Sequence, residues 1–420
     1  MLFLSIIVFE RGILCCLFFY VISHYSNLPF RAWEQRKLRD FTKISQGLQI
    51  AISDRYLENG DNRELYITNE FLNTYSSPKY YIENPPENVI ANEDDILMTR
   101  TGNTGKVITN VIGAFHNNFF KIDYNPMKTS KLFLYYVLVS ENIQKEILIK
   151  AGTSTIPDLK HNDFYSIVIQ VPKIQEQQKI GDFFKQLDNT IALHQRKLDT
   201  LKLMKKGFLQ QMFPNNDEEI PKVRFADFDG MWKQRKLNSI TEKITRKNKE
   251  LESTLPLTIS AQDGLIDQNE YFNKIIASRN IRGYFLVKNG EFAYNKSYSK
   301  GYPWGVVKRL DNYNMGVLST LYIIFKPVKI NSDFLTKYFD STYWYRAVSQ
   351  FATEGARNHG LLNIAASDFF EIELNIPLNN EEQKKIGLFF QQLENIIILH
   401  QNKLEKLSIL KKTYLKKMFI

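Results

Sequence analysis

One long stretch of this chain occurs twice. Residues 176–213 and 382–419 superimpose without a gap at a shift of 206 positions, and both carry the pattern F-F-x-Q-L-[DE]-N followed by L-H-Q-x-K-L-[DE]. A shorter repeat, W-x-Q-R-K-L, begins at Trp33 and again at Trp232. Repeats in solenoid proteins are only about 20–50 residues long. The sequence therefore predicts two tandem modules, each a variable globular half followed by a nearly copied helix.

The repeated segments have the apolar spacing of a coiled coil. Apolar residues follow each other at intervals of four and three, which is the a/d pattern of heptads. A histidine and a lysine take the two remaining seam positions of each copy. The seam residues that we expect at the helix and subunit interface are Ile180, Phe184, Leu187, Ile191, His194, Leu198 and Leu201 in the first copy and Ile386, Phe390, Leu393, Ile397, His400, Leu404 and Leu407 in the second.

A long helix with one apolar stripe needs a partner, and the nearest partner is the other copy. A duplicated chain whose halves are related by a pseudo-twofold axis pairs the two helices antiparallel. In that arrangement we expect His194 to face Lys411, and Lys205 to face His400, because polar seam residues fix the register of coiled coils. The alternative for both histidines is a partly exposed seam position without a special role.

The two variable halves, 34–171 and 233–376, read as mixed α/β domains because short β-rich runs alternate with helical stretches. The predicted strands are Leu65–Thr68, Asp95–Thr99, Lys106–Thr109, Phe292–Asn295 and Val317–Phe325, and the predicted helices are Lys131–Ala151 and Asp333–Ala352. The predicted domains are an atypical N-terminal segment (1–30), globular domains at 31–171 and 221–376, and long helices at 172–214 and 377–420.

Each half has a polar, glycine-containing loop after a predicted strand, and a second polar segment after its predicted helix, at 152–159 and 355–362. Arg, Lys, Asn, Ser and Thr are the side chains that contact phosphates and base edges. The residues that we expect to contact DNA are Arg100, Thr101, Asn103, Thr104, Lys106, Asn295, Lys296, Ser297, Tyr298, Lys300, Tyr302, Arg357, Asn358 and His359. Ordinary surface turns are the alternative for each of these segments.

The net charge, the two cysteines and the lack of catalytic motifs limit the classes of function that fit this chain. The net charge of +10 favours a polyanionic partner. Each repeated helix holds eight Lys/Arg and four Asp/Glu, so the helices supply most of this charge and the globular halves are close to neutral. The two cysteines, Cys15 and Cys16, are adjacent and fit neither a disulfide framework nor a metal site. The sequence contains no convincing set of catalytic residues. For example, Asn84-Pro85-Pro86 lacks the aromatic residue that completes this motif in amino-methyltransferases. We therefore expect a non-catalytic protein without a metal.

The first 30 residues do not fit the repeat. The apolar run Gly12–Ile22 is too short to span a bilayer, which needs about 20 residues. Before Trp33 and Trp232 only the tryptophan itself matches between the modules. The hypothesis is that this segment is foreign to the fold, through an upstream frameshift or a misassigned start; membrane anchoring is the alternative.

The duplicated helices, the W-x-Q-R-K-L pattern and the F-F-x-Q-L-[DE]-N…L-H-Q-x-K-L-[DE] signature together resemble the specificity (S) subunit of type I restriction–modification systems over residues 33–420. The resemblance implies two target recognition domains that read a bipartite, asymmetric site in double-stranded DNA. It also implies that the antiparallel helices act as a ruler and as a docking surface for two modification (M) subunits. The missing aromatic motif before Trp33 departs from the family's pattern and puts the start of the first recognition domain in doubt.

The resemblance further implies a cytoplasmic protein that binds no cofactor itself. S-adenosylmethionine belongs to the M subunits, and ATP and Mg are expected on the partner subunits, among them the restriction (R) subunits that cleave DNA. Two other function classes stay open: a coiled-coil scaffold without DNA readout, and a DNA-modifying enzyme whose motifs are not recognised.

Overall fold

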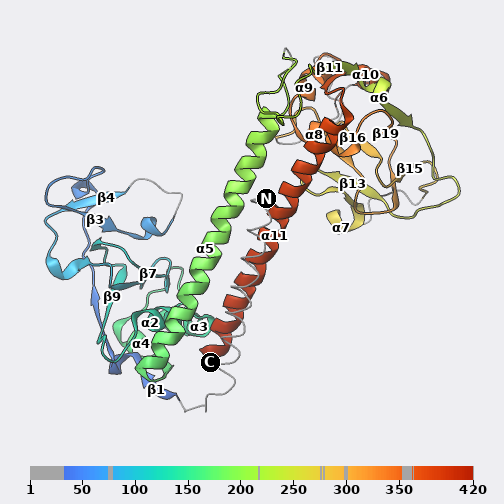
Figure 1. The fold of residues 1–420 in the computed structure, drawn as a ribbon. Helices are drawn as coiled ribbons and strands as arrows, with labels where there is room; N and C mark the ends of the chain where they lie inside the picture. The colour runs from blue at the N-terminus through green and yellow to red at the C-terminus, as the bar shows by residue number, and fades with distance from the viewer. Residues whose placement is uncertain are drawn as a thin grey trace. The chain divides into compact units, whose positions relative to one another are not determined.

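The structure is a computed structural model that describes residues 33–73, 79–215, 218–274, 277, 280–297, 301–351, 362 and 364–419 (Figure 1). It divides into unit 1, residues 1–192 with 405–420, and unit 2, residues 193–404. Each unit thus takes a globular domain and a part of both long helices. None of the helices in the described ranges is long and apolar enough to cross a membrane.

The described residues of unit 1 form two four-stranded sheets and one two-stranded sheet, with strand orders β2-β9-β6-β7, β4-β3-β8-β5 and β1-β10. Its strands are β1 Glu34–Lys37, β2 Thr42–Gln46, β3 Arg63–Ile67, β4 Tyr80–Glu83, β5 Ile90–Ala91, β6 Ile96–Thr99, β7 Val107–Thr109, β8 Gly113–Phe115, β9 Phe119–Tyr124 and β10 Val168–Val171. Its helices are α2 Lys131–Leu138, α3 Glu141–Ala151, α4 His161–Ser166 and the first part of α5 Ile174–Gln211, with short 3-10 helices at Leu38–Asp40, Ile52–Asp54, Asn69–Leu72 and Glu87–Val89.

The described residues of unit 2 repeat one of these four-stranded sheets, as β12-β19-β16-β17, and the terminal strand pair, as β11-β20; they also form two further strand pairs, β13-β14 and β15-β18. Its strands are β11 Lys233–Lys236, β12 Thr241–Ile244, β13 Leu257–Ser260, β14 Gly264–Asp267, β15 Phe285–Lys288, β16 Phe292–Asn295, β17 Val306–Arg309, β18 Met315–Leu318, β19 Ile323–Pro327 and β20 Glu373–Ile376. Its helices are α6 Leu237–Ile240, α7 Gln268–Phe272, α8 Ser332–Asp340, α9 Trp344–Ser349, α10 Ala366–Glu371 and most of α11 Asn380–Met418.

Three predicted elements are each divided in two. The predicted helix Lys131–Ala151 is interrupted because Ser140 has an extended backbone and its hydroxyl donates to the carbonyl of Val137. The predicted helix Asp333–Ala352 is α8 and α9, and Ala352 lies outside the described residues. The predicted strand Val317–Phe325 is β18 and β19, separated by a turn in which the amide of Tyr322 donates to Ser319.

The W-x-Q-R-K-L repeat attaches each globular domain to the start of its long helix. Its residues form β1 and β11, which pair antiparallel with β10 and β20, the strands that lead into α5 and α11. The indole of Trp33 donates to Glu176 over 3.2 Å, and that of Trp232 donates to Glu382 over the same distance. Both carboxylates lie in the first turns of their long helices. In each unit, the W-x-Q-R-K-L motif and the start of the repeated long helix therefore contact each other.

A glutamine and a glycine complete this contact in each unit. Gln177 accepts from the amide of Ser130, the N-cap of α2, and Gln383 accepts from the amide of Asn331, the N-cap of α8. Four residues later comes a glycine in each long helix. A Cβ on Gly387 would lie 2.7 Å from the Cβ of Asp333 and 3.0 Å from the amide of Phe334, so α11 and α8 pack closer there than any side chain allows.

Replacing Gly387 with alanine is expected to destabilise unit 2 by about 1–3 kcal/mol, because overpacking outweighs the gain in helix propensity. Gly207 in α5 is the matched control, since a Cβ there has nothing within 4 Å. Its alanine variant should be more stable by about 0.5–1 kcal/mol. Denaturant unfolding of both variants checks this. The account is wrong if both substitutions change stability in the same direction.

Candidate nucleic-acid and subunit interfaces

In unit 1 the two polar segments that the sequence singled out lie against each other. The amide of Leu159 donates to the carbonyl of Arg100 over 2.8 Å, and the hydroxyl of Thr104 donates to Pro157 over 2.7 Å. Thr101 and Asp158 form an antiparallel bridge. The loop between β6 and β7 and the segment 152–159 therefore form one surface at the edge of the four-stranded sheet.

This loop is held in one shape by its own backbone. The amide of Gly105 donates to the carbonyl of Thr99 over 2.8 Å, and that of Lys106 donates to the Thr99 hydroxyl over 2.9 Å. Gly102 and Gly105 have φ values of +75° and +88°, which favour glycine. The side chains of Asn103 and Lys106 are exposed on it. A loop of fixed shape with exposed polar side chains is suited to contact the groove of a nucleic acid.

Arg100 is engaged within the domain. Its Nη2 donates to Asp158 over 2.7 Å, and its guanidinium lies 5.7 Å from the centre of the Phe120 ring. This pairing leaves the exposed Asn103 and Lys106 as the side chains of the loop best placed for an outside ligand.

Unit 2 has the same arrangement between β16 and β17. The amide of Leu362 donates to the carbonyl of Lys296 over 3.0 Å, as that of Leu159 does to Arg100. The amine of Lys296 donates to Ile364, and the carboxamide of Asn295 accepts from the amide of Ser297. Tyr302 is half-buried in the same loop. The predicted contact residues Tyr298, Lys300, Arg357, Asn358 and His359 lie outside the described residues, as does the N-terminal segment.

The long helices pack on each other within each unit. In unit 1 the ring of Phe183 on α5 meets Tyr414 on α11 at 5.5 Å, and in unit 2 the ring of Phe208 meets Phe389 at 5.0 Å. Within unit 2, His194 meets His400 and Phe208 meets Phe389, so the partners follow opposite order and the pair is antiparallel. Leu198, Leu393 and Ile397 form a buried seam cluster with the partly buried Leu201 and Leu404.

The other predicted seam residues lie outside this cluster. Ile180 and Phe184 belong to the core of the unit 1 domain, and Ile386 and Phe390 to that of unit 2. Leu187 and Leu407 are buried, and Ile191 is half-buried. The start of each helix therefore packs into its globular domain as well as along its partner helix.

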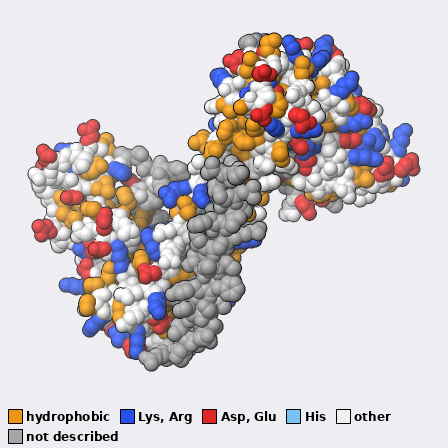
Figure 2. All heavy atoms as spheres, in the orientation of Figure 1, with side chains coloured by type: hydrophobic (Ala, Val, Ile, Leu, Met, Phe, Trp, Pro, Cys, Tyr) orange, Lys and Arg blue, Asp and Glu red, His pale blue; other side chains and the backbone are white. Residues whose placement is uncertain are grey.

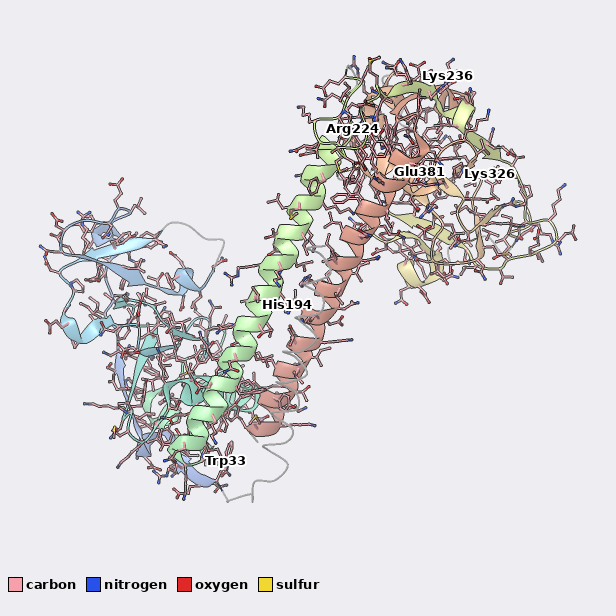
Figure 3. All side chains as sticks on the ribbon, viewed as in Figure 1. Trp33, His194, Arg224, Lys236, Lys326 and Glu381 are labelled. Atoms are coloured by element: carbon pink, nitrogen blue, oxygen red, sulfur yellow. The ribbon has the colours of Figure 1, made fainter. Side chains whose placement is uncertain are left out.

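The predicted register of the polar seam residues is wrong. His194, which Figure 3 labels on α5, lies opposite His400. The two Nδ1 atoms are 2.9 Å apart, so one ring donates and the other accepts. Lys205 pairs with Glu394, and Lys411 with Asp188, each over 2.6 Å. The prediction considered only the seam and overlooked the carboxylates beside it, which satisfy both lysines.

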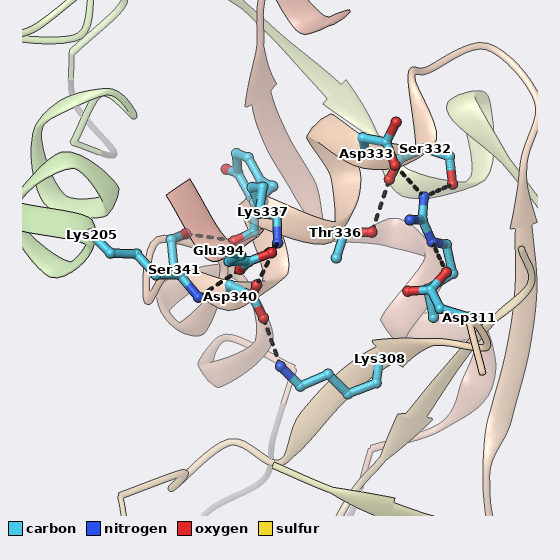
Figure 4. Close-up of polar contacts among 12 residues, drawn as sticks. Lys205, Lys308, Asp311, Ser332, Asp333, Thr336, Lys337, Asp340, Ser341 and Glu394 are labelled. Atoms are coloured by element: carbon cyan, nitrogen blue, oxygen red, sulfur yellow. Dashed lines mark hydrogen bonds and ion pairs between the residues drawn. The ribbon is translucent and has the colours of Figure 1, made fainter. Parts of the chain in front are cut away.

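A partly buried charge network attaches the unit 2 domain to both helices (Figure 4). The amine of Lys337 on α8 donates to both oxygens of Glu394 on α11, which also pairs with Lys205 on α5. Asp340 pairs with Lys308 over 2.6 Å and with Lys337 over 3.5 Å. Burial alone would raise the pKa of Asp340, but the two ammonium groups outweigh it and hold this pKa below its usual value.

Unit 1 has a simpler version of this network. The hydroxyl of Tyr136 on α2 donates to Asp188 over 2.8 Å, and Lys411 pairs with the same carboxylate. Burial and the hydrogen bond to Asp188 raise the pKa of Tyr136 well above its usual value.

Replacing Asp340 with asparagine is expected to lower the stability of unit 2 by about 2 kcal/mol near neutral pH, because Lys308 then loses its partner. A depressed pKa in the folded state means that the contribution is present above the unfolded pKa and is lost as pH falls through the folded pKa. The difference between the two proteins should therefore shrink below about pH 4. Urea unfolding at several pH values measures it, and a difference that grows on acidification would contradict this reading.

The outer faces of the long helices carry exposed apolar side chains at repeat-equivalent positions. Leu193 and Leu399 are 43% and 55% exposed, and Leu203 and Ile409 are 71% and 58% exposed. On the face that Figure 2 shows, basic and acidic side chains are interspersed on both units. Among the residues described, no cluster of His, Cys, Asp or Glu is arranged to hold a metal ion.

The sequence reading overlooked the residues that attach the domains to the helices. Glu176, Gln177 and Gly181 lie off the apolar seam, and each recurs 206 positions later. Polar or glycine residues copied within a repeat, outside its apolar stripe, were the available signal.

Comparison with known proteins agrees with the repeat. Residues 31–203 match the family model described as Type I restriction modification DNA specificity domain. The chain is 24% identical over 404 residues to the "Type I restriction enzyme MjaVIII specificity subunit" of Methanocaldococcus jannaschii, covering 90% of each chain. Its fold is similar to that of the type I restriction-modification S subunit from M. genitalium, with a TM-score of 0.57, 15% identity and coverage of 94% and 98% of the two chains. A structure from a study of complex assembly of a type I system has a TM-score of 0.50 at 14% identity and covers 93% and 98%.

Proposed function

Because this chain belongs to the family of type I restriction-modification specificity subunits, we propose that each unit reads one part of a bipartite duplex DNA site. The reading surfaces are the β6–β7 loop with residues 152–159 in unit 1, and the β16–β17 loop with its neighbouring segment in unit 2. A specificity subunit is a non-catalytic component of its system. Methyl transfer with S-adenosylmethionine, and ATP- and Mg-dependent cleavage, therefore fall to partner subunits that meet the chain in the cytoplasm.

The observation that carries this proposal is the equivalence of the two loop pairs. In both units the loop joins an edge strand to its neighbour, and a leucine amide of a distant segment donates to the carbonyl of the loop's first residue. The scaffold is therefore the same while the exposed side chains differ. That combination suits two surfaces that read different half-sites, since base readout depends on a few side chains in the groove.

The test uses the chain assembled with its modification subunits on a library of random duplexes. Retained duplexes should share a motif in two parts. Replacing residues 101–104 with glycine and serine should relax one part only, and replacing residues 296–302 in the same way should relax the other. The proposal fails if either variant relaxes both parts or neither.

We also infer that the two helices dock two copies of the modification subunit, with restriction subunits joining that complex. Support comes from the exposed apolar pairs Leu193/Leu399 and Leu203/Ile409, which present the same chemistry twice. Because these exposed side chains recur at equivalent positions of the repeat, they fit two copies of one partner. The expectation that the helices also act as a ruler stays a prediction.

Replacing Leu203 or Ile409 with glutamate is expected to reduce the bound modification subunits from two to one, and replacing both should leave none. A charge buried at an interface without a partner costs several kcal/mol. Ile149 is the control because it is 79% exposed and belongs to α3, not to either long helix. Native mass spectrometry reads the stoichiometry, and two bound copies on the double variant would exclude this docking surface.

A further inference from the structure

In unit 2 the residues before Trp232 fold onto the start of α11. Arg224 donates from Nε and Nη2 to the two oxygens of Glu382 over 2.7 and 2.8 Å, and these side chains are 12% and 1% exposed. Trp232 donates to the same carboxylate (Figure 3 marks Arg224). Bidentate, charge-assisted pairs of this kind are among the stronger polar contacts in proteins. We call residues 223–228 the clip.

Aromatic and charged side chains hold the rest of the clip. Phe225 meets the ring of Phe389 edge-on at 6.1 Å. Lys385 pairs with Asp227 and lies 5.2 Å from the centre of the Phe228 ring. The clip thus engages a carboxylate, an ammonium group and an aromatic ring on successive turns of α11.

At the start of α5, unit 1 has the same residue types that bind the clip on α11 in unit 2. Glu176, Lys179 and Phe183 are the repeat-equivalents of the three receiving residues of α11. Glu176 accepts from Trp33, as its counterpart does from Trp232, but among the described residues no lysine or arginine pairs with it. Trp33 is only half-buried, whereas Trp232 is 0% exposed.

The sequence before Trp33 does not repeat the clip. Arg224 stands eight residues before Trp232, and Tyr25 stands eight residues before Trp33. We propose that Glu176, Lys179 and Phe183 form a binding site for an arginine–phenylalanine segment, of the pattern R-F-x-x-F, supplied by another polypeptide.

The internal repeat supports this assignment through matching chemistry. In unit 2 the same three residue types hold an R-F-x-x-F segment of this chain. The arginine of the incoming segment would neutralise the Glu176 carboxylate, and its first phenylalanine would cover Phe183. Binding would attach the start of the unit 1 domain to α5, as the clip attaches that of unit 2 to α11. This inference does not depend on the proposed DNA readout.

A labelled peptide with the sequence of residues 221–231 is the probe, and fluorescence anisotropy with the full chain is the measurement. We expect one peptide to bind each chain. Glu176→Gln, or methionine in place of the peptide's arginine, should weaken binding at least tenfold. Asp182→Asn is the matched control, because it removes an exposed charge from the same helix and should leave binding unchanged.

A second variant tests the site from the other side. In it, residues 22–32 are replaced by a copy of residues 221–231, so that the chain supplies its own segment. This chain should no longer bind the peptide. Equal binding to the Glu176→Gln variant, unchanged binding to the second variant, or no binding at about millimolar peptide would each overturn the proposal.

Discussion

Replacing Glu382 with alanine is expected to lower the free energy of unfolding of unit 2 by about 3–5 kcal/mol. Its carboxylate is 1% exposed and is the partner of Arg224 and of the Trp232 indole. Removing it leaves a largely buried guanidinium without a counter-charge, and burying an unpaired charge is among the most destabilising changes a single substitution makes. Denaturant unfolding followed by tryptophan fluorescence measures the loss.

The chain provides a matched control in Glu176. It occupies the same position in the repeat and accepts the same tryptophan hydrogen bond, but it has no arginine partner among the described residues. Its alanine variant should cost only about 1 kcal/mol, the usual net value of one hydrogen bond. Equal costs at the two positions would show that the buried ion pair does not account for the difference between the units.

Replacing both Asn103 and Lys106 with alanine is expected to weaken sequence-specific DNA retention by the assembled complex about 30- to 20,000-fold. Lost base and phosphate contacts cost about 1–3 kcal/mol each when they carry specificity. Both side chains are exposed on the β6–β7 loop, so the thermal unfolding of the chain should not change. Titration with duplex DNA at fixed salt measures the affinity, because salt alone changes it strongly.

Lys43 is the matched control for this pair. It is exposed on β2, at the opposite edge of the same sheet. Its alanine variant removes the same charge but should leave specific retention within about twofold. A loss as large as that of the loop variant would mean that general charge, and not the loop, governs retention.

The two-module architecture could be predicted because the long-helix segment and the W-x-Q-R-K-L motif each occur twice in the sequence. The 206-residue repeat and the 3.5-residue apolar spacing define two modules and an antiparallel helix pair, and the long helices and mixed α/β domains are confirmed. Local breaks were harder to predict. Ser140 interrupts one predicted helix, and its hydroxyl donates to the carbonyl of Val137, a local contact that competes with helix geometry.

The register of the helix pair and the detailed structure of the polar loops could not be predicted. Both depend on side-chain contacts that the spacing of apolar residues does not reveal. The seam pattern allowed several alignments, and the carboxylates of Asp188 and Glu394 selected the one that places His194 against His400. At the loops, residue type indicated a polar surface. Only the fold reveals that Arg100 is held by Asp158, a residue 58 positions later.

The measurement that tests the central claim most directly is the adenine methylome of the source cell with and without the gene for this chain. The account predicts a methylated motif in two separated parts that disappears on deletion, and whose two parts change independently when the loops of units 1 and 2 are altered. An unchanged methylome, from cells in which the chain and its modification subunits assemble, would contradict it.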